Sequence, residues 1–155
     1  MAELDLPPCG LYRTTLAHPD RPEQVGSGRL VHFHNHSNSG KPIVLLPKEN
    51  THNVWTFHDR GYSAPDAAWC HTLQPLLEEG LYVTNDAVQV ADDRLLAEGQ
   101  LVQLGYNGFG DPILFFPTRA TSANALLFPE KGLKIAVAHL AALTAVKLAG
   151  AKRVN

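Results

Sequence analysis

The sequence predicts a β-rich α+β fold built from two tandem units of about 70 residues each. Three observations lead to this prediction. Four segments recur in the same order along the 155-residue chain, short apolar runs alternate with turn residues, and each half ends in a stretch of helical character. We therefore expect a first repeat over residues 10–79 and a second repeat over residues 80–150.

The recurrence is ordered and nearly constant in spacing. Residues 10–14 recur as 80–84, 28–31 as 99–102, 40–47 as 110–117 and 51–61 as 122–132. Every pair is separated by 70 or 71 residues, so single-residue insertions alone reconcile the two copies. The pattern indicates an internal duplication.

Each copy contains the signature of short strands joined by a tight turn. Residues 29–36 alternate, with Val31 and Phe33 on one face and three histidines on the other. Residues 100–106 place Val102 and Leu104 on the equivalent face, which identifies the side that faces the core. Hairpin turns are expected at 37–40 and 107–110, and strands at 10–15, 43–46 and 113–116.

Two helices complete the expected units. The first covers residues 64–74, with a cap near Ser63, Pro65 in its first turn and Pro75 at its end. The second is an amphipathic C-terminal helix over residues 133–149. Short strands, a long first loop, a hairpin and a terminal helix resemble small barrels of the SH3-like kind. Two such barrels, packed with pseudo-two-fold symmetry, would form one compact unit.

Composition narrows the classes of partner and location. The net charge is -2 and no run of Lys or Arg occurs, which argues against nucleic acid. The apolar stretch 133–149 is short and contains charges, so no membrane partner is expected. Residues 1–8 do not have the pattern of an export signal, and we expect a cytoplasmic protein. Cys9 and Cys70 are too few and too far apart for a disulfide framework, and we expect both thiols to be mostly buried.

The histidines distinguish the two copies most sharply. Seven of the eight lie in the first half: His18, His32, His34, His36, His52, His58 and His71. The second copy has Gln103, Gly105, Asn107 and Ala123 where the first has His32, His34, His36 and His52. Because the fold evidently forms without these imidazoles, they are candidates for function.

Metal binding is one reading of this histidine set. Its candidate ligands are His32, His34, His36, His52 and His58, and the cofactor would be Zn or another divalent transition metal. Histidines two and four residues apart on one straight strand lie about 7 and 13 Å from each other, so a site needs a ligand from elsewhere. The alternative reading is a polar strand face with no cofactor.

A recognition surface is the other reading of the first copy. Trp55 stands where the second copy has Leu126, and Tyr62 follows in the same segment. Such amphipathic side chains favour contact with ligands or proteins. The predicted binding residues are Trp55, Tyr62, His34, His52 and Asn53.

The chain has none of the sequence motifs of common enzyme classes. Cys70 and His71 are neighbours, but adjacent residues on a helix point about 100 degrees apart and form no catalytic dyad. We favour a non-catalytic, soluble binding or regulatory protein that recognises a protein or a small molecule and has the option of pairing into a homodimer through edge strands. The alternatives are a metal-dependent enzyme or metal sensor, or an acid-base enzyme that uses His34 or His52 with Asp59.

Overall fold

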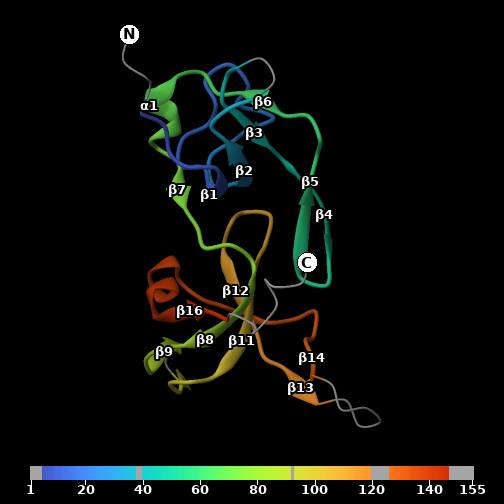
Figure 1. Ribbon diagram of the computed structural model, residues 1–155, viewed down its shortest axis with the longest axis vertical. Helices are drawn as coiled ribbons and strands as arrows, with labels where there is room; N and C mark the ends of the chain where they lie inside the picture. The colour runs from blue at the N-terminus through green and yellow to red at the C-terminus, as the bar shows by residue number, and fades with distance from the viewer. Residues whose placement is uncertain (1–4, 38–39, 92, 120–125, 147–155) are drawn as a thin grey trace, which may run out of the picture. The chain divides into compact units, whose positions relative to one another are not determined.

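The computed structural model describes residues 5–37, 40–91, 93–119 and 126–146, which form small sheets with very little helix (Figure 1). The prediction of a β-rich chain is confirmed. Two compact units divide the chain: the first comprises residues 1–78 and 106–111, and the second comprises residues 79–105 and 112–155. Within the described residues, no helix is long and apolar enough to cross a membrane.

The first unit is built on one five-stranded sheet. Its strands are β1 (Gly10–Arg13), β2 (Leu30–His34), β3 (Ile43–Leu45), β6 (Tyr62–Ser63) and β7 (Gln74–Pro75), in the order β6-β3-β2-β1-β7. A separate hairpin joins β4 (Pro47–Thr51) to β5 (Val54–Phe57), and a single-turn helix, α1, covers Ala67–Cys70.

The second unit has a five-stranded sheet with the same arrangement. Its strands are β8 (Gly80–Thr84), β11 (Leu101–Tyr106), β12 (Pro112–Phe115), β15 (Leu133–Lys134) and β16 (Leu143–Ala145), in the order β15-β12-β11-β8-β16. Two further pairs are β9 (Val88–Ala91) with β10 (Arg94–Leu96) and β13 (Thr118–Arg119) with β14 (Leu126–Leu127). A 3-10 helix, η1, covers Val137–Ala142.

The two sheets also share their register. Tyr12 pairs with Val31 as Tyr82 pairs with Val102, and Val44 pairs with Tyr62 as Leu114 pairs with Leu133. A buried threonine closes the long loop after the first strand of each sheet. The Thr14 hydroxyl donates to Gly26 O (2.6 Å) and accepts from Arg29 N–H (3.0 Å), and Thr84 makes the same pair of bonds with Ala97 O (2.6 Å) and Gln100 N–H (2.8 Å).

The core of each sheet lies on the face that the alternation predicts. Val31 and Phe33 are fully buried, as are Val102 and Leu104. In the first unit Val31 and Phe33 pack with residues from the neighbouring strands, the loops and α1: Tyr12, Val25, Val44, Ala64, Trp69, Cys70 and Leu73. Tyr12 and Phe33 meet edge to face, with ring centroids 5.7 Å apart.

The helix predicted over residues 64–74 is far shorter than expected. It covers only Ala67–Cys70, and its N-cap is Asp66, whose carboxylate accepts from the Trp69 N–H at 2.8 Å. The chain then leaves the helix because Gln74 and Pro75 pair with β1 as an edge strand. An edge strand tolerates proline, since the missing N–H can face away from the ladder.

The prediction of a helix over residues 133–149 is wrong. Leu133–Lys134 and Leu143–Ala145 are strands, and only Val137–Ala142 between them is helical, as a 3-10 turn. The alanine-rich composition misled the prediction because edge pairing of β16 with β8 outweighs local helix propensity. Residues 147–149 lie outside the described part of the chain.

A glycine sits at the point of closest approach between strands in each sheet. A side chain at Gly61 would overlap the carbonyl oxygen of Val44, and one at Gly132 would overlap the carbonyl oxygen of Leu114. Both glycines precede the short strand that pairs with β3 or β12. The two positions therefore require glycine for lack of space rather than for an unusual backbone angle.

Replacing Gly61 is expected to destabilise the first unit. Gly61→Ala forces a methyl group into the backbone of β3, and overpacking of this kind typically costs about 1–3 kcal/mol. Gly108→Ala is the matched control, because a methyl group there meets no atom within 4 Å. Urea denaturation of both variants measures the difference, and equal midpoints would contradict the close approach.

Candidate functional site

Two hollows in the surface of the first unit share a wall. The larger, of about 590 Å³, is lined by Leu46, Lys48, His58, Asp59, Arg60, Gly61 and Tyr62. The smaller, of about 360 Å³, is lined by His18, Asp20, Arg21, Gly61, Tyr62 and Ser63. We call the pair the Tyr62 cleft, because Gly61 and Tyr62 line both hollows. Each hollow has a volume in the range of small-molecule sites.

Backbone pairing fixes the walls of the Tyr62 cleft. Tyr62 begins β6 and pairs with Val44 of β3, and the absence of a side chain at Gly61 lets the two strands meet. On the other side, the His58 N–H donates to Leu46 O at 3.0 Å, which anchors the chain as it leaves β5. The loop 58–62 is therefore held at both ends.

Tyr62 is half-buried, and its ring packs against the core of the first unit. The guanidinium carbon of Arg21 lies 5.7 Å from the centre of the Tyr62 ring, within the range of a cation–π contact. The phenol ring thus has a fixed position while part of its surface stays open to solvent.

His18 is the buried histidine of the cleft wall. Its Nδ1 accepts from the Asp20 N–H (3.1 Å), and its Nε2 donates to Ser63 O (2.8 Å). Only the neutral tautomer with its proton on Nε2 satisfies both bonds. The side chain, 3% exposed, links the loop after β1 to β6. Sequence reasoning counted His18 but gave it no role, since nothing local predicts a bond to a residue 45 positions away.

The strand histidines form a row on the face of β2 opposite the core. The ring centroids of His32 and His34 are 4.6 Å apart, and those of His34 and His36 are 6.4 Å apart. Phe57 of β5 meets His32 edge to face at 5.5 Å. Burial lowers the pKa of His32, and the neighbouring His34 lowers it further. The Nδ1 of His32 is buried without a hydrogen-bond partner.

The five candidate metal ligands lie in three places. His32 and His34 lie in β2 and His36 follows it. His52 lies in the turn between β4 and β5, and His58 lines the Tyr62 cleft. Among the residues that the structure describes, no three His, Cys, Asp or Glu side chains are grouped so that they could hold a metal ion.

His52 and Asn53 form the turn of the β4–β5 hairpin. Both have positive φ, 53° and 69°, as a two-residue type I′ turn requires. Histidine and asparagine are among the residues that adopt this conformation most readily. Asn53 is only 7% exposed. The turn geometry alone accounts for the residue types at these two predicted binding positions.

Trp55 has a structural partner. Its indole N–H donates to the carbonyl oxygen of Tyr106 at 2.6 Å, and the Tyr106 hydroxyl in turn donates to Leu77 O at 2.7 Å. Residues 106–111 belong to the first unit, so Trp55 helps to hold this segment in place. The tryptophan that replaces Leu126 of the second copy thus has a role in the fold.

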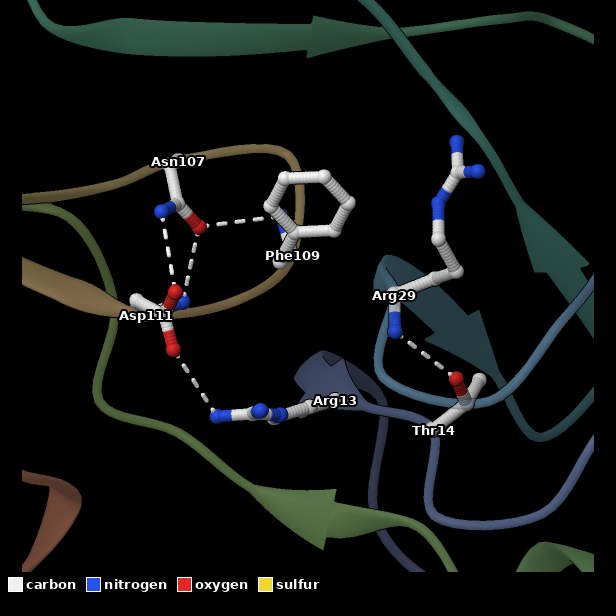
Figure 2. A network of polar contacts seen from close by, with 6 residues as sticks. All are labelled: Arg13, Thr14, Arg29, Asn107, Phe109 and Asp111. Carbon is white, nitrogen blue, oxygen red and sulfur yellow. Dashed lines mark hydrogen bonds and ion pairs between the residues drawn. The ribbon is translucent and has the colours of Figure 1, made fainter.

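A polar network orders the turn 107–111, as Figure 2 shows. The Asn107 side chain accepts from the N–H groups of Phe109 (2.9 Å) and Asp111 (3.0 Å) and donates to the Asp111 carboxylate (3.0 Å). The other carboxylate oxygen of Asp111 forms an ion pair with Arg13 at 3.1 Å. Asn107 aligns with His36 in the sequence, and its side chain supports the turn 107–111.

The two cysteines differ in environment, and neither forms a disulfide. Cys70 is fully buried, as predicted, and burial raises the pKa of its thiol. The expectation that Cys9 is buried is wrong: it is exposed, and its thiol lies 3.3 Å from Asn35 Oδ1 and 3.8 Å from His36 Nδ1. Cys9 directly precedes β1, in an exposed segment of the chain.

Comparison of the chain with protein-family models, curated proteins and solved structures finds no match.

The pKa of His32 predicts a pH dependence of stability. The unfolded chain binds a proton at His32 near pH 6.5, whereas the folded protein does so only at lower pH. The free energy of unfolding is therefore expected to fall as pH decreases below about 6.5, until the folded-state pKa is passed. His32→Gln, which copies Gln103, is expected to flatten this dependence in urea titrations, whereas His58→Gln is the exposed control. An unchanged slope in His32→Gln would contradict the assignment.

The cysteine environments predict selective labelling. One thiol per native chain is expected to react with a disulfide reagent such as 5,5′-dithiobis(2-nitrobenzoate), because Cys9 is exposed and Cys70 is fully buried. The second thiol reacts only on unfolding. Absorbance of the released thiolate gives the count, and Cys9→Ser should remove the fast reaction. Two thiols that react at one rate would be inconsistent with these environments.

Proposed function

We propose that this protein is a non-catalytic binding protein made of two SH3-like units related by internal duplication, and that the first unit binds a small ligand in the Tyr62 cleft. Matching strand order and register in the two sheets support the duplication. The position of Tyr62 on the shared wall of two hollows supports the site. A fixed aromatic ring beside open space is a typical contact surface for a ligand.

Tyr62 is a better candidate for ligand contact than Trp55. Both are half-buried aromatic residues of the first copy, but the indole N–H of Trp55 already bonds to Tyr106 O. No hydrogen bond of the Tyr62 hydroxyl is formed within the described residues, so this group is free to bond to a ligand. The equivalent position of the second sheet has Leu133, so the fold does not require the phenol.

The environment of His18 favours binding over catalysis in the smaller hollow. Both ring nitrogens of His18 are engaged with the backbone, so it cannot exchange a proton with a ligand without losing a structural bond. The remaining groups of the wall can bind and orient a molecule, through hydrogen bonds, charge and contact with the phenol ring.

The decisive variant is Tyr62→Leu, which copies the residue at the equivalent position of the second sheet. Saturation-transfer NMR with a library of small aromatic and polar fragments is expected to detect binding to the natural protein and its loss in Tyr62→Leu. Phe109→Leu is the matched control, because Phe109 is a 60% exposed aromatic residue of the same unit outside the cleft. The proposal fails if no fragment binds, or if Tyr62→Leu binds the same fragments as Phe109→Leu.

A further inference from the structure

The lining of the larger hollow carries an excess of positive charge. Lys48 and Arg60 contribute two permanent cations and Asp59 one carboxylate, which leaves a local charge of +1 in a chain whose net charge is -2. His58 adds a further polar group to the same wall. The hollow is thus unlike an apolar pocket, and its local charge is opposite in sign to the net charge of the chain.

The two cations are not engaged by other described residues. Within the part of the chain that the structure describes, neither Lys48 nor Arg60 takes part in an ion pair or a side-chain hydrogen bond. Both side chains are exposed, so their donors are solvated and available. Even though Asp59 is the neighbour of Arg60 in sequence, the two do not pair.

The smaller hollow adds a third cation next to the aromatic ring. Arg21 lies over the Tyr62 ring, and Asp20 is the acid of this wall. Since both nitrogens of His18 are engaged, Arg21 is the positively charged side chain of this lining that can donate to a negatively charged group. Cationic groups therefore stand on both sides of Tyr62.

Most of the residues that line the larger hollow differ at the equivalent positions of the second copy. At offsets of 70 or 71 residues, Thr118 stands for Lys48, Pro129 for His58 and Leu133 for Tyr62, whereas Lys131 keeps the charge of Arg60. The second sheet nevertheless has the same strand order and register. The second sheet thus forms without a lysine or a phenol at these positions, so Lys48 and Tyr62 are candidates for ligand contact.

From these observations we infer that the Tyr62 cleft takes a small ligand that carries an oxyanion, a phosphate or a carboxylate, on a planar body. Lys48 and Arg60 hold the oxyanion, and the planar body rests on the exposed part of the Tyr62 ring. This inference rests on the proposed function, because it names the class of ligand for that same cleft. The absence of a continuous basic stripe along the chain makes a small anion a better fit than a polyanion.

The test uses four probes on the full chain: phenyl phosphate, benzoate, inorganic phosphate and the neutral benzyl alcohol. Isothermal titration is expected to show the tightest binding for phenyl phosphate or benzoate, weaker binding for inorganic phosphate and the weakest for benzyl alcohol. Binding of the anions is expected to weaken as salt is raised, because exposed charges are screened. The preference between phenyl phosphate and benzoate tells which oxyanion the cleft selects.

The matched variants separate charge in the cleft from charge elsewhere. Lys48→Thr combined with Arg60→Met is expected to weaken binding of phenyl phosphate about tenfold or more, since each charge-assisted hydrogen bond contributes that order of affinity. Lys41→Met removes an exposed lysine outside the cleft lining and is expected to leave affinity unchanged. Thermal unfolding checks that all variants fold.

The outcomes distinguish this inference from the proposed function. If benzyl alcohol binds as tightly as phenyl phosphate and Tyr62→Leu abolishes both, the cleft is a binding site but the oxyanion inference is wrong. Anion binding that survives Lys48→Thr with Arg60→Met also overturns the inference. If none of the four probes binds the natural protein, the inference is rejected. The proposed function is tested separately, by the fragment screen.

Discussion

The close approach of Gly61 to the backbone of β3 is the constraint on which the candidate site depends. Because no side chain stands between them, β6 can pair with β3 and Tyr62 takes its place opposite Val44. The same glycine lines both hollows of the Tyr62 cleft, so the contact that completes the sheet also shapes the site. Gly132 meets the same steric limit beside Leu114, but the residue that follows it is Leu133. One steric solution thus serves two sheets, and in the first sheet the glycine is followed by Tyr62 and lies in the same hollow as Lys48 and Arg60.

Side chains that looked functional in the sequence divide into those that the fold engages and those that it leaves open. Trp55 bonds to Tyr106 O, and His18 bonds to two backbone groups. His52 supplies one of the two positive-φ residues of a hairpin turn. Tyr62 and Lys48 remain open to solvent at the cleft. When the fold engages an indole N–H or an imidazole nitrogen, that donor or acceptor is no longer available to a ligand. Fewer histidine and aromatic side chains of the first copy can therefore bind a ligand than their number in the sequence suggests.

Much of the sheet architecture could be predicted from the sequence, because strands leave a local signal. Alternation placed Val31 and Phe33 on the core face, and their complete burial confirms it. The helices could not be predicted in this way. The stretch after Gly132 has good helix formers, yet β16 pairs with β8, a partner some 60 residues earlier in the chain. Tyr62 was predicted as a binding residue, but the cleft around it was not, for a related reason. Its lining includes Lys48, Arg60 and Arg21, which come from separate segments that no local pattern brings together.

Net charge is a poor guide to what the cleft can bind. At physiological ionic strength exposed charges interact over about 8 Å, so a ligand in the hollow responds to Lys48 and Arg60 far more than to acids elsewhere on the surface. The overall charge of -2 argues against polyanions that spread over a large area, but it does not oppose a single phosphate or carboxylate at a site with local charge +1. Asp59 within the same wall limits how strongly a bare anion can bind. Useful affinity then requires a second contact, and the half-buried Tyr62 ring provides the surface for it.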